Sequence, residues 1–144
     1  MAAFMPDTNC MVAVILRSHD HHQRATAAIG GRLESGEMMV LAAPSIIETY
    51  SVLTRLPRSL RLQGPIAAQA IQHGFLDRSE MTALDGESYK ATVTDCALRG
   101  VVGGAVYDAV IAACALTARV DVLLTFNERH FAGLRSSGID VLVP

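Results

Sequence analysis

Apolar residues along the chain fall into short continuous runs that alternate with longer amphipathic stretches. Short runs that are apolar on both faces are typical of strands buried in a parallel sheet. We expect such strands over residues 3–5, 38–41, 120–125 and 139–143. The longer stretches predict helices over residues 9–16, 21–34, 45–56, 65–75, 86–99 and 105–118. Right-handed crossovers would bring the carboxyl ends of the strands to one edge of the sheet, where ligands bind in folds of this kind.

The composition predicts one folded domain over residues 1–144. Hydrophobic residues make up 51% of the chain, charged residues make up 18%, and the mean hydropathy is +0.32, which excludes a disordered or collagen-like chain. Cys10, Cys96 and Cys114 form no CxxC pair, so we expect buried free thiols in a reducing compartment. The longest apolar stretch, residues 101–118, contains two glycines and an aspartate. Because no secretory or membrane-spanning pattern is present, we expect a soluble, cytoplasmic protein.

Three carboxylates stand in apolar surroundings, where an unpaired charge is costly. Asp7 follows the first predicted strand, Glu48 lies in the helix after the second strand, and Asp108 lies near the start of the last long helix. Each has an ordinary structural explanation when it is taken alone. Asp7 would cap the helix that follows it, and Glu48 would form a capping box with Ser45. Asp108 would interact with the dipole of its helix.

Taken together, the three carboxylates are predicted to meet at one edge of the sheet. Three carboxylates that lie close together repel one another and cannot all stay ionised unless a cation neutralises them. Oxygen ligands of this kind favour Mg²⁺ or Mn²⁺. Asn127, after the strand over residues 120–125, would add a fourth oxygen ligand. Such a cluster indicates phosphoryl chemistry with water as the nucleophile.

Four short segments in this order resemble the motifs of PIN domains, and the end of the chain resembles the ends of VapC-type toxins. The four segments are Asp7-Thr8-Asn9, Ser45-Ile46-Ile47-Glu48, Tyr107-Asp108-Ala109-Val110-Ile111-Ala112-Ala113 and Leu124-Thr125-Phe126-Asn127. The C-terminal segments are Phe126-Asn127-Glu128-Arg129-His130-Phe131 and Gly138-Ile139-Asp140-Val141. The resemblance covers essentially the whole chain. Each motif alone is weak, whereas four in register are specific.

The resemblance implies a three-layer α/β/α PIN-like fold with a central, mostly parallel sheet of four to five short strands. It also implies a metal-dependent endoribonuclease of a type II toxin–antitoxin pair, which forms a homodimer and is inhibited by a small antitoxin of the VapB type. The residues that match the family's metal ligands are Asp7, Glu48 and Asp108. The position of Asn127 often holds Asp in the family, so this chain has one formal charge fewer there.

A mechanism follows from these ligands. The three carboxylates would hold Mg²⁺, with Mn²⁺ as an alternative, and the metal would lower the pKa of a bound water and contact the scissile phosphate of RNA. One of the carboxylates, for example Glu48, would take the proton of the water. Thr8 and Asn9 would orient the Asp7 carboxylate by hydrogen bonds.

Two further groups of residues, one of arginines and one of histidines, each have two possible interpretations. Arg55, Arg58 and Arg61 either form a solvated turn or clamp RNA phosphates beside the metal, and Arg55 is the best placed because it lies two helical turns from Glu48. The loop that contains His19, His21 and His22 is more typical of solvated histidines than of a zinc site, although one of them could contact RNA or the antitoxin.

Two other classes of function remain open from the sequence. A PIN fold could bind RNA or a partner protein without catalysis. An aspartyl-phosphotransfer phosphatase is less favoured, because it needs a second acid where this chain has Asn9 and a lysine at the site, whereas the single lysine, Lys90, lies in a polar helix. The net charge of −2 does not exclude RNA as a substrate, because Asp7, Glu48 and Asp108 supply −3 of it and leave +1 on the rest of the chain.

Overall fold

The computed structural model describes all 144 residues and contains five strands, six α-helices and two 3₁₀ segments. The strands are β1 (Ala3–Pro6), β2 (Met38–Ala42), β3 (Ser79–Thr82), β4 (Val122–Leu124) and β5 (Asp140–Leu142). The helices are α1 (Thr8–Ile15), α2 (His22–Glu34), α3 (Ala43–Thr54), α4 (Gly64–Gly74), α5 (Gly86–Arg99) and α6 (Ala105–Ala118). The 3₁₀ segments are η1 (Leu76–Arg78) and η2 (Glu128–Ser137).

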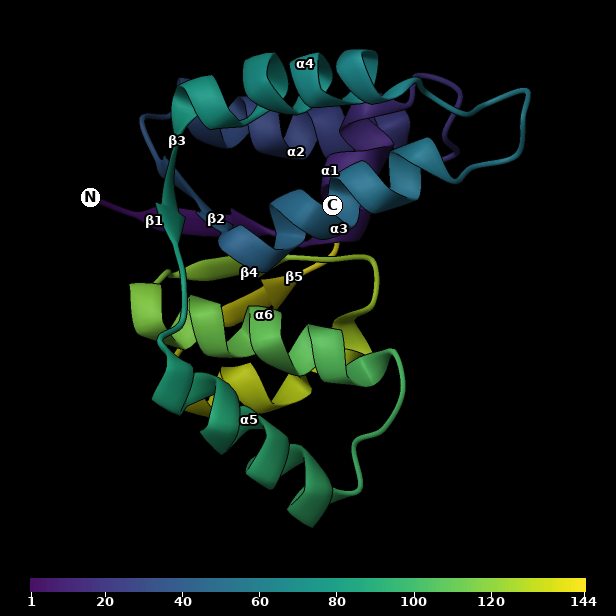
Figure 1. The fold of residues 1–144 in the computed structure, drawn as a ribbon. Helices are drawn as coiled ribbons and strands as arrows, with labels where there is room; N and C mark the ends of the chain where they lie inside the picture. Colours follow the sequence, from purple (N-terminus) through teal and green to yellow (C-terminus); the bar gives the residue numbers. More distant parts are fainter.

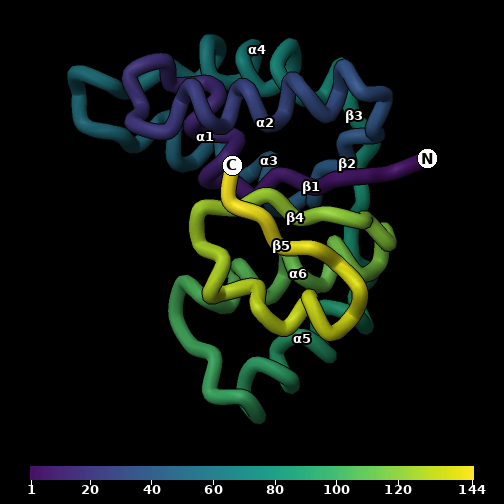
Figure 2. The backbone as a smooth tube through the Cα atoms, turned by 180° about the vertical axis from the view of Figure 1, so that it is seen from behind, coloured from purple at the N-terminus to yellow at the C-terminus, as the bar shows by residue number.

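The five strands form one parallel sheet in the order β3-β2-β1-β4-β5. Figure 1 shows α1, α2, α3 and α4 on one side of this sheet and α5 and α6 on the other. In the reverse view of Figure 2, β1, β4 and β5 run between the two groups of helices. The three-layer α/β/α arrangement with a parallel sheet is therefore confirmed.

The strands read as continuous apolar runs because both faces of the sheet are buried. Successive strand residues alternate between two cores: Phe4 packs with α1 and α2, whereas Met5 packs with α6 and η2. In β2, Met39 packs in the same core as Phe4, and Val40 packs in the same core as Met5. All of these side chains are buried, and this two-sided burial is the condition that favours a parallel sheet over an antiparallel one.

The predicted helices and strands are largely confirmed, whereas the strand β3 was not predicted. This strand lies at the edge of the sheet, pairs only with β2, and has the half-exposed sequence Ser-Glu-Met-Thr. An edge strand with polar residues carries neither the apolar run nor the alternation that identifies buried strands. The sheet was expected to have four to five strands, but no strand was predicted at residues 79–82.

The capping box that Ser45 and Glu48 offered as an alternative explanation is not formed. Helix α3 begins two residues earlier, at Ala43, with Pro44 in its first turn, and no side chain caps it. Proline is favoured there because its missing N–H needs no partner in the first turn. Ser45 is therefore inside the helix, where its hydroxyl is buried without a hydrogen-bond partner. Glu48 is released from capping and is available for another role.

The strand order places a crevice beside β1. From β1 the chain moves to β2 and β3 on one side and only later to β4 and β5 on the other. In open parallel sheets, ligands bind at the carboxyl ends of the strands where the order reverses in this way. Here that point lies between the ends of β1 and β4, which are followed by Asp7 and Thr125. No helix of the protein is long and apolar enough to cross a membrane.

Candidate active site

The Asp7 carboxylate is buried at the carboxyl end of β1 and is held from two sides. Its side chain caps α1 by accepting a hydrogen bond of 2.7 Å from the backbone N–H of Thr8. Its second oxygen accepts a hydrogen bond of 2.8 Å from the hydroxyl of Thr125, which follows β4. Only 2% of Asp7 is exposed. The carboxylate is therefore fixed at the junction of β1 and β4 before any ligand binds.

Burial makes the charge of Asp7 costly. Desolvation raises the pKa of this carboxyl from 3.8 to about 6, against the lowering effect of the hydrogen bond from Thr125. The negative charges of Asp108 and Glu48 also contribute to this raised pKa, and the Thr8 N–H opposes it. A buried carboxylate that also faces two other acids gains from a nearby cation, because the cation offsets both desolvation and repulsion.

A small pocket of about 220 Å³ brings the predicted residues together at this edge of the sheet. We call it the carboxylate pocket, and its lining residues are Asp7, Thr8, Asn9, Val12, His19, Glu48, Val52, Asp108 and Asn127. A wider hollow of about 890 Å³ between α3 and α6 shares Glu48, Asp108 and Asn127 with it. All four predicted ligands, from four different segments of the chain, therefore border one pocket.

The carboxylates share the pocket without forming a complete ligand set. No three His, Cys, Asp or Glu side chains in the structure converge closely enough to hold a metal ion. Glu48 and Asp108 are only partly buried, in contrast to Asp7. Asp108 is engaged elsewhere by one oxygen, through a contact of 2.5 Å with Nδ1 of His130.

The hydrogen bonds around Asp7 correct part of the sequence prediction. Thr8 contacts the Asp7 carboxylate through its backbone N–H and not through its hydroxyl. Asn9 does not contact Asp7: its amide nitrogen lies 3.5 Å from the Thr125 hydroxyl, and its amide oxygen accepts a bond from the N–H of Phe126. Thr125, which sequence reasoning did not single out, is the residue that orients Asp7. The only signal in the sequence was a buried threonine directly after a strand.

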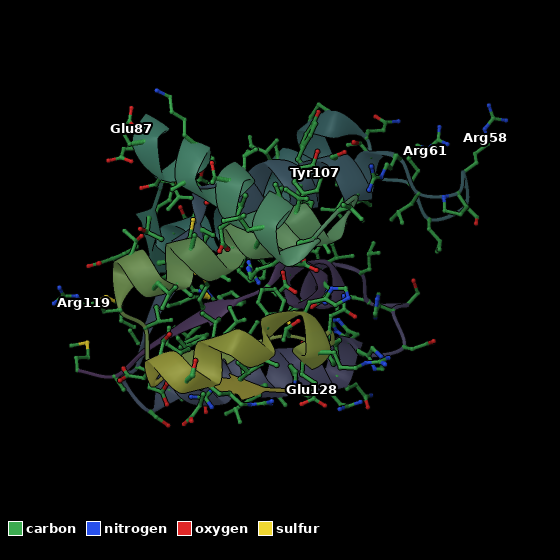
Figure 3. The ribbon with its side chains drawn as sticks, turned by 90° about the horizontal axis from the view of Figure 1, so that it is seen from below. Arg58, Arg61, Glu87, Tyr107, Arg119 and Glu128 are labelled. Carbon is green, nitrogen blue, oxygen red and sulfur yellow. The ribbon has the colours of Figure 1, made fainter.

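The three arginines are not brought together. Arg55 borders the wider hollow beside Glu48 and Asp108. Arg58 and Arg61 are exposed on the loop between α3 and α4, which projects from the body of the protein in Figure 3. Arg61 donates to the carbonyl of Leu56 at 2.9 Å, which fixes it within its own turn. Of the three, only Arg55 is placed to meet a substrate at the carboxylates.

The histidine loop is more ordered than a solvated loop. His19 borders the carboxylate pocket, and its ring lies 5.6 Å from that of His21. His21 in turn stacks on Phe126 with ring centroids 4.3 Å apart. His22 makes a contact of 2.9 Å with the carbonyl of Ala13 and thereby ties α2 to α1. These contacts place His19 at the mouth of the pocket.

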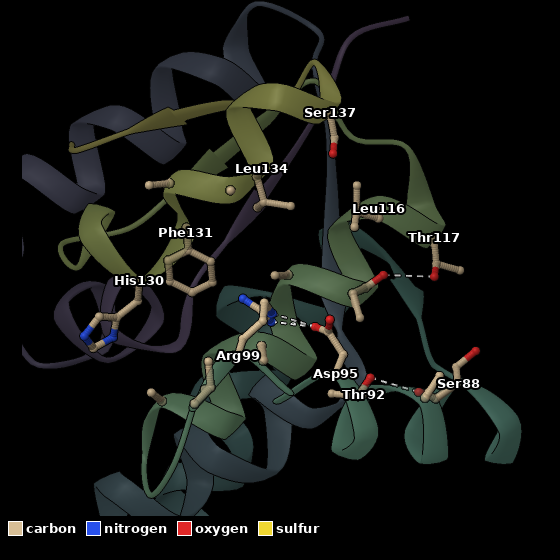
Figure 4. A pocket seen from close by; sticks show the side chains of 18 of the residues that line it. Ser88, Thr92, Asp95, Arg99, Leu116, Thr117, His130, Phe131, Leu134 and Ser137 are labelled. Carbon is tan, nitrogen blue, oxygen red and sulfur yellow. Dashed lines mark hydrogen bonds and ion pairs between the residues drawn. The ribbon is translucent and has the colours of Figure 1, made fainter. Parts of the chain in front are cut away.

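A third hollow, of about 730 Å³, lies between α5, α6 and η2 (Figure 4). More than half of the residues that line it are apolar, and its charged residues include Asp95 and Arg99, which pair with each other at 2.6 Å. Asp95 is the only carboxylate among them and is paired with Arg99, so this hollow holds no cluster of acids. Lys90, the single lysine, is exposed on α5 and pairs with Glu87, away from the carboxylate pocket. The acids predicted from the sequence therefore border the carboxylate pocket and not this hollow.

The chain is similar to known proteins in sequence and in fold. The family model for the PIN domain matches residues 4–135. Ribonuclease VapC40 of Mycobacterium tuberculosis is 36% identical over 118 residues, which cover 82% of each chain. Ribonuclease VapC27 of the same organism is 31% identical over 137 residues, which cover 95% of this chain and 93% of the relative. The structure of VapBC2 from Rickettsia felis, bound to a DNA fragment from its promoter, superimposes with a TM-score of 0.67 and 17% identity over 99% of this chain and 98% of that one.

These similarities place the fold and the sequence in one class, that of the nucleases built on the PIN domain. The chain belongs to the PIN-domain family and, within it, to the VapC-type ribonucleases. Ribonucleases of this family depend on bound metal, which agrees with the acidic lining of the pocket.

The raised pKa of Asp7 predicts a specific dependence of stability on pH. Because the folded chain holds the Asp7 proton up to about pH 6 and the unfolded chain releases it near 3.8, the free energy of unfolding falls as the pH rises between these values. The contribution that is lost between about pH 3.8 and 6 is about 2 kcal/mol. Urea unfolding of wild type and Asp7→Asn, with a chelator present, measures it.

The variant Asp7→Asn should show a flatter pH profile than the wild type, with most of the difference between the two pKa values, 3.8 and about 6. Asp140→Asn serves as the control, because Asp140 is exposed at the start of β5. Parallel profiles for wild type and Asp7→Asn would contradict the raised pKa.

Proposed function

We propose that this protein is a Mg²⁺-dependent endoribonuclease toxin of a type II toxin–antitoxin pair, in which Asp7, Glu48 and Asp108 hold the cation and Asn127 adds a fourth oxygen. The observation that carries the proposal is the buried Asp7 carboxylate, which shares one pocket with two other acids. Mn²⁺ is the alternative cation, because it accepts the same oxygen ligands.

The donors around the pocket fit a hard divalent cation. The three carboxylates and the amide of Asn127 supply oxygen ligands, and no cysteine borders the pocket. The hydroxyl of Thr8 is buried there without a hydrogen-bond partner, so it can bind a water of the hydrated cation. Asp7 is fixed by two hydrogen bonds, whereas Glu48 is partly exposed and makes no hydrogen bond within the chain.

The chain's own residues divide the work of hydrolysis. A divalent cation held by these ligands supplies Lewis-acid activation of water and neutralises charge on the scissile phosphate. Glu48, whose carboxylate makes no hydrogen bond within the chain, accepts the proton of the attacking water. The water oxygen bonds to phosphorus, the P–O bond to the leaving ribose oxygen breaks, and that oxygen takes a proton from solvent. Thr125 keeps Asp7 oriented through this step, and Arg55 meets the phosphate backbone of the RNA.

Two kinds of protein partner fit this class of protein. The VapBC2 structure supports an inhibitory antitoxin of the VapB type as one partner. A second copy of the chain is the other, and the support for it is a pair of exposed apolar side chains that border the hollow between α3 and α6. Ile47 is 72% exposed and Tyr107 is 63% exposed, and Figure 3 shows Tyr107 at the surface of α6. Apolar side chains that gather in this way mark contact surfaces.

Loss of one carboxylate should abolish cleavage without unfolding the protein. In Asp7→Asn and Asp108→Asn we expect the rate of cleavage of a fluorophore-labelled RNA in Mg²⁺ or Mn²⁺ to fall at least about 100-fold, or about 2.7 kcal/mol. The exposed Asp140→Asn is the matched control and should cleave at the wild-type rate. Wild-type rates in both site variants would overturn the ligand assignment, and a wild type that binds RNA without cleaving it would favour a non-catalytic module.

Arg55 should contribute to RNA binding, and Arg58 should not. In Arg55→Ala we expect a raised KM for RNA and a salt dependence of log Kd that is shallower by about one unit, because one phosphate contact is lost. Arg58→Ala removes the same charge from the projecting loop and serves as the control. Measurement of RNA affinity by fluorescence anisotropy at several salt concentrations distinguishes the two. Equal effects in both variants would indicate a general charge effect.

A charged side chain introduced into the exposed apolar surface of Ile47 and Tyr107 should prevent dimer formation. For wild type we expect a mass of twice 15.4 kDa by light scattering, and for Ile47→Glu a mass near the single-chain value. Leu98→Glu is the control, because Leu98 is 83% exposed on α5 and does not border this hollow. A wild type that stays monomeric at high concentration would remove the second copy as a partner.

A further inference from the structure

The segment that follows β4 reaches two of the three carboxylates. Its first residue, Thr125, donates its hydroxyl to Asp7 at 2.8 Å. Five residues later, Nδ1 of His130 lies 2.5 Å from an oxygen of Asp108. Glu48 has no such partner within the chain. Asp7 and Asp108 lie about 100 residues apart in the sequence. One short segment, residues 125–130, nevertheless contacts both of their carboxylates.

The position of His130 is fixed independently of Asp108. Its backbone N–H donates to the carbonyl of Asn127 at 3.0 Å, in the first turn of η2. The next residue, Phe131, is 1% exposed and lies in the core between the sheet and α6, together with Leu134. This anchor holds the backbone of η2 against α6. The imidazole is therefore preorganised, and 49% of its side chain remains exposed.

The same packing brings Asp108 to the histidine. Asp108 lies one turn before Ile111 on α6, so both side chains stand on the same face of the helix. Ile111 is 1% exposed and shares its core cluster with Phe131. The packing of α6 on η2 thus aligns Ile111 with Phe131 and, one turn earlier, Asp108 with His130. Figure 4 shows His130 at the edge of the α5–α6–η2 hollow, with its ring directed away from the Asp95–Arg99 pair.

We propose that His130 is a positioning residue for the metal site, which holds one oxygen of Asp108 so that the other faces the carboxylate pocket. An ionised carboxylate only accepts hydrogen bonds, so Nδ1 of the ring carries the proton that is shared. The hydrogen bond restricts the rotation of a partly exposed aspartate and reduces the entropy that cation binding must overcome. This proposal rests on the proposed function, because it takes Asp108 as a metal ligand.

The direct test is the affinity of the purified protein for Mn²⁺ and Mg²⁺, measured by calorimetry. We expect His130→Ala to weaken cation binding about 10- to 100-fold, which is the usual effect of removing a residue that orients a metal ligand. His130→Asn should restore most of the affinity, because the amide nitrogen of Asn replaces Nδ1. Arg129→Ala is the matched control, since Arg129 is exposed on the same segment and makes no hydrogen bond or ion pair.

A second measurement separates positioning from a purely structural role. Cleavage of RNA by His130→Ala should require more Mn²⁺ and should approach the wild-type rate when Mn²⁺ is in excess, whereas the thermal unfolding midpoint without metal should match that of Arg129→Ala. Unchanged or tighter Mn²⁺ binding in His130→Ala overturns the proposal, and so does an Asn variant that behaves like the Ala variant. A wild type that binds no cation overturns it too.

The same titration distinguishes failure of this proposal from failure of the proposed function. Asp108→Asn should lose more affinity than His130→Ala. If Asp108→Asn binds Mn²⁺ as the wild type does, Asp108 is no ligand and both statements fail. If Asp108→Asn is weakened and His130→Ala is not, only the role of His130 fails. A wild type that binds Mn²⁺ through these residues and cleaves no RNA would remove the nuclease function and leave the positioning role intact.

Discussion

The buried carboxylate of Asp7 is the constraint on which the rest of the site depends. It stands where β1 ends, and its own N–H donates to the carbonyl of Leu124 on β4 at 2.8 Å. Its two oxygens then connect to the start of α1 and to Thr125. One residue thus joins the two central strands and the first helix. The sheet cannot keep this register without placing a charge in a desolvated position, which is unfavourable unless a cation or a proton compensates it.

Much of this architecture follows from local pattern. The strands β1, β2, β4 and β5 were predicted correctly because both of their faces are buried, which makes each an apolar run. Helices α5 and α6 also begin and end at the predicted residues. Helix α5 shows why: Asp85 accepts from the N–H of Ser88 at its start, and Gly100 ends it at a φ of +69°. Such residues act within a few positions of themselves, so the sequence alone reveals them.

Other features depend on contacts between distant residues, and these are the ones that sequence reasoning missed. The hydroxyl of Thr125 acquires its role from a residue 118 positions away, and His130 acquires its role from one 22 positions away. No spacing rule connects them, because the connection is made by strand order and by the packing of η2 on α6. The same reason explains Asn9, whose amide contacts Thr125 and not its neighbour Asp7. Parallel strand ends identify which acids meet, and tertiary packing decides what holds each of them.

The three acids differ in how many hydrogen bonds hold their carboxylates. Asp7 is fixed by two hydrogen bonds in the protein interior, Asp108 by one at the protein surface, and Glu48 by none. A rigid ligand lowers the entropic cost of binding a cation, whereas a group that must collect a proton from water needs freedom to move. In the proposed site, the acids that would meet these two needs come from elements with different support: a central strand end, a helix start braced by η2, and the second turn of α3. Helix α3 has no side-chain cap and Glu48 makes no hydrogen bond within the chain, which fits the freedom that its proposed role as proton acceptor requires.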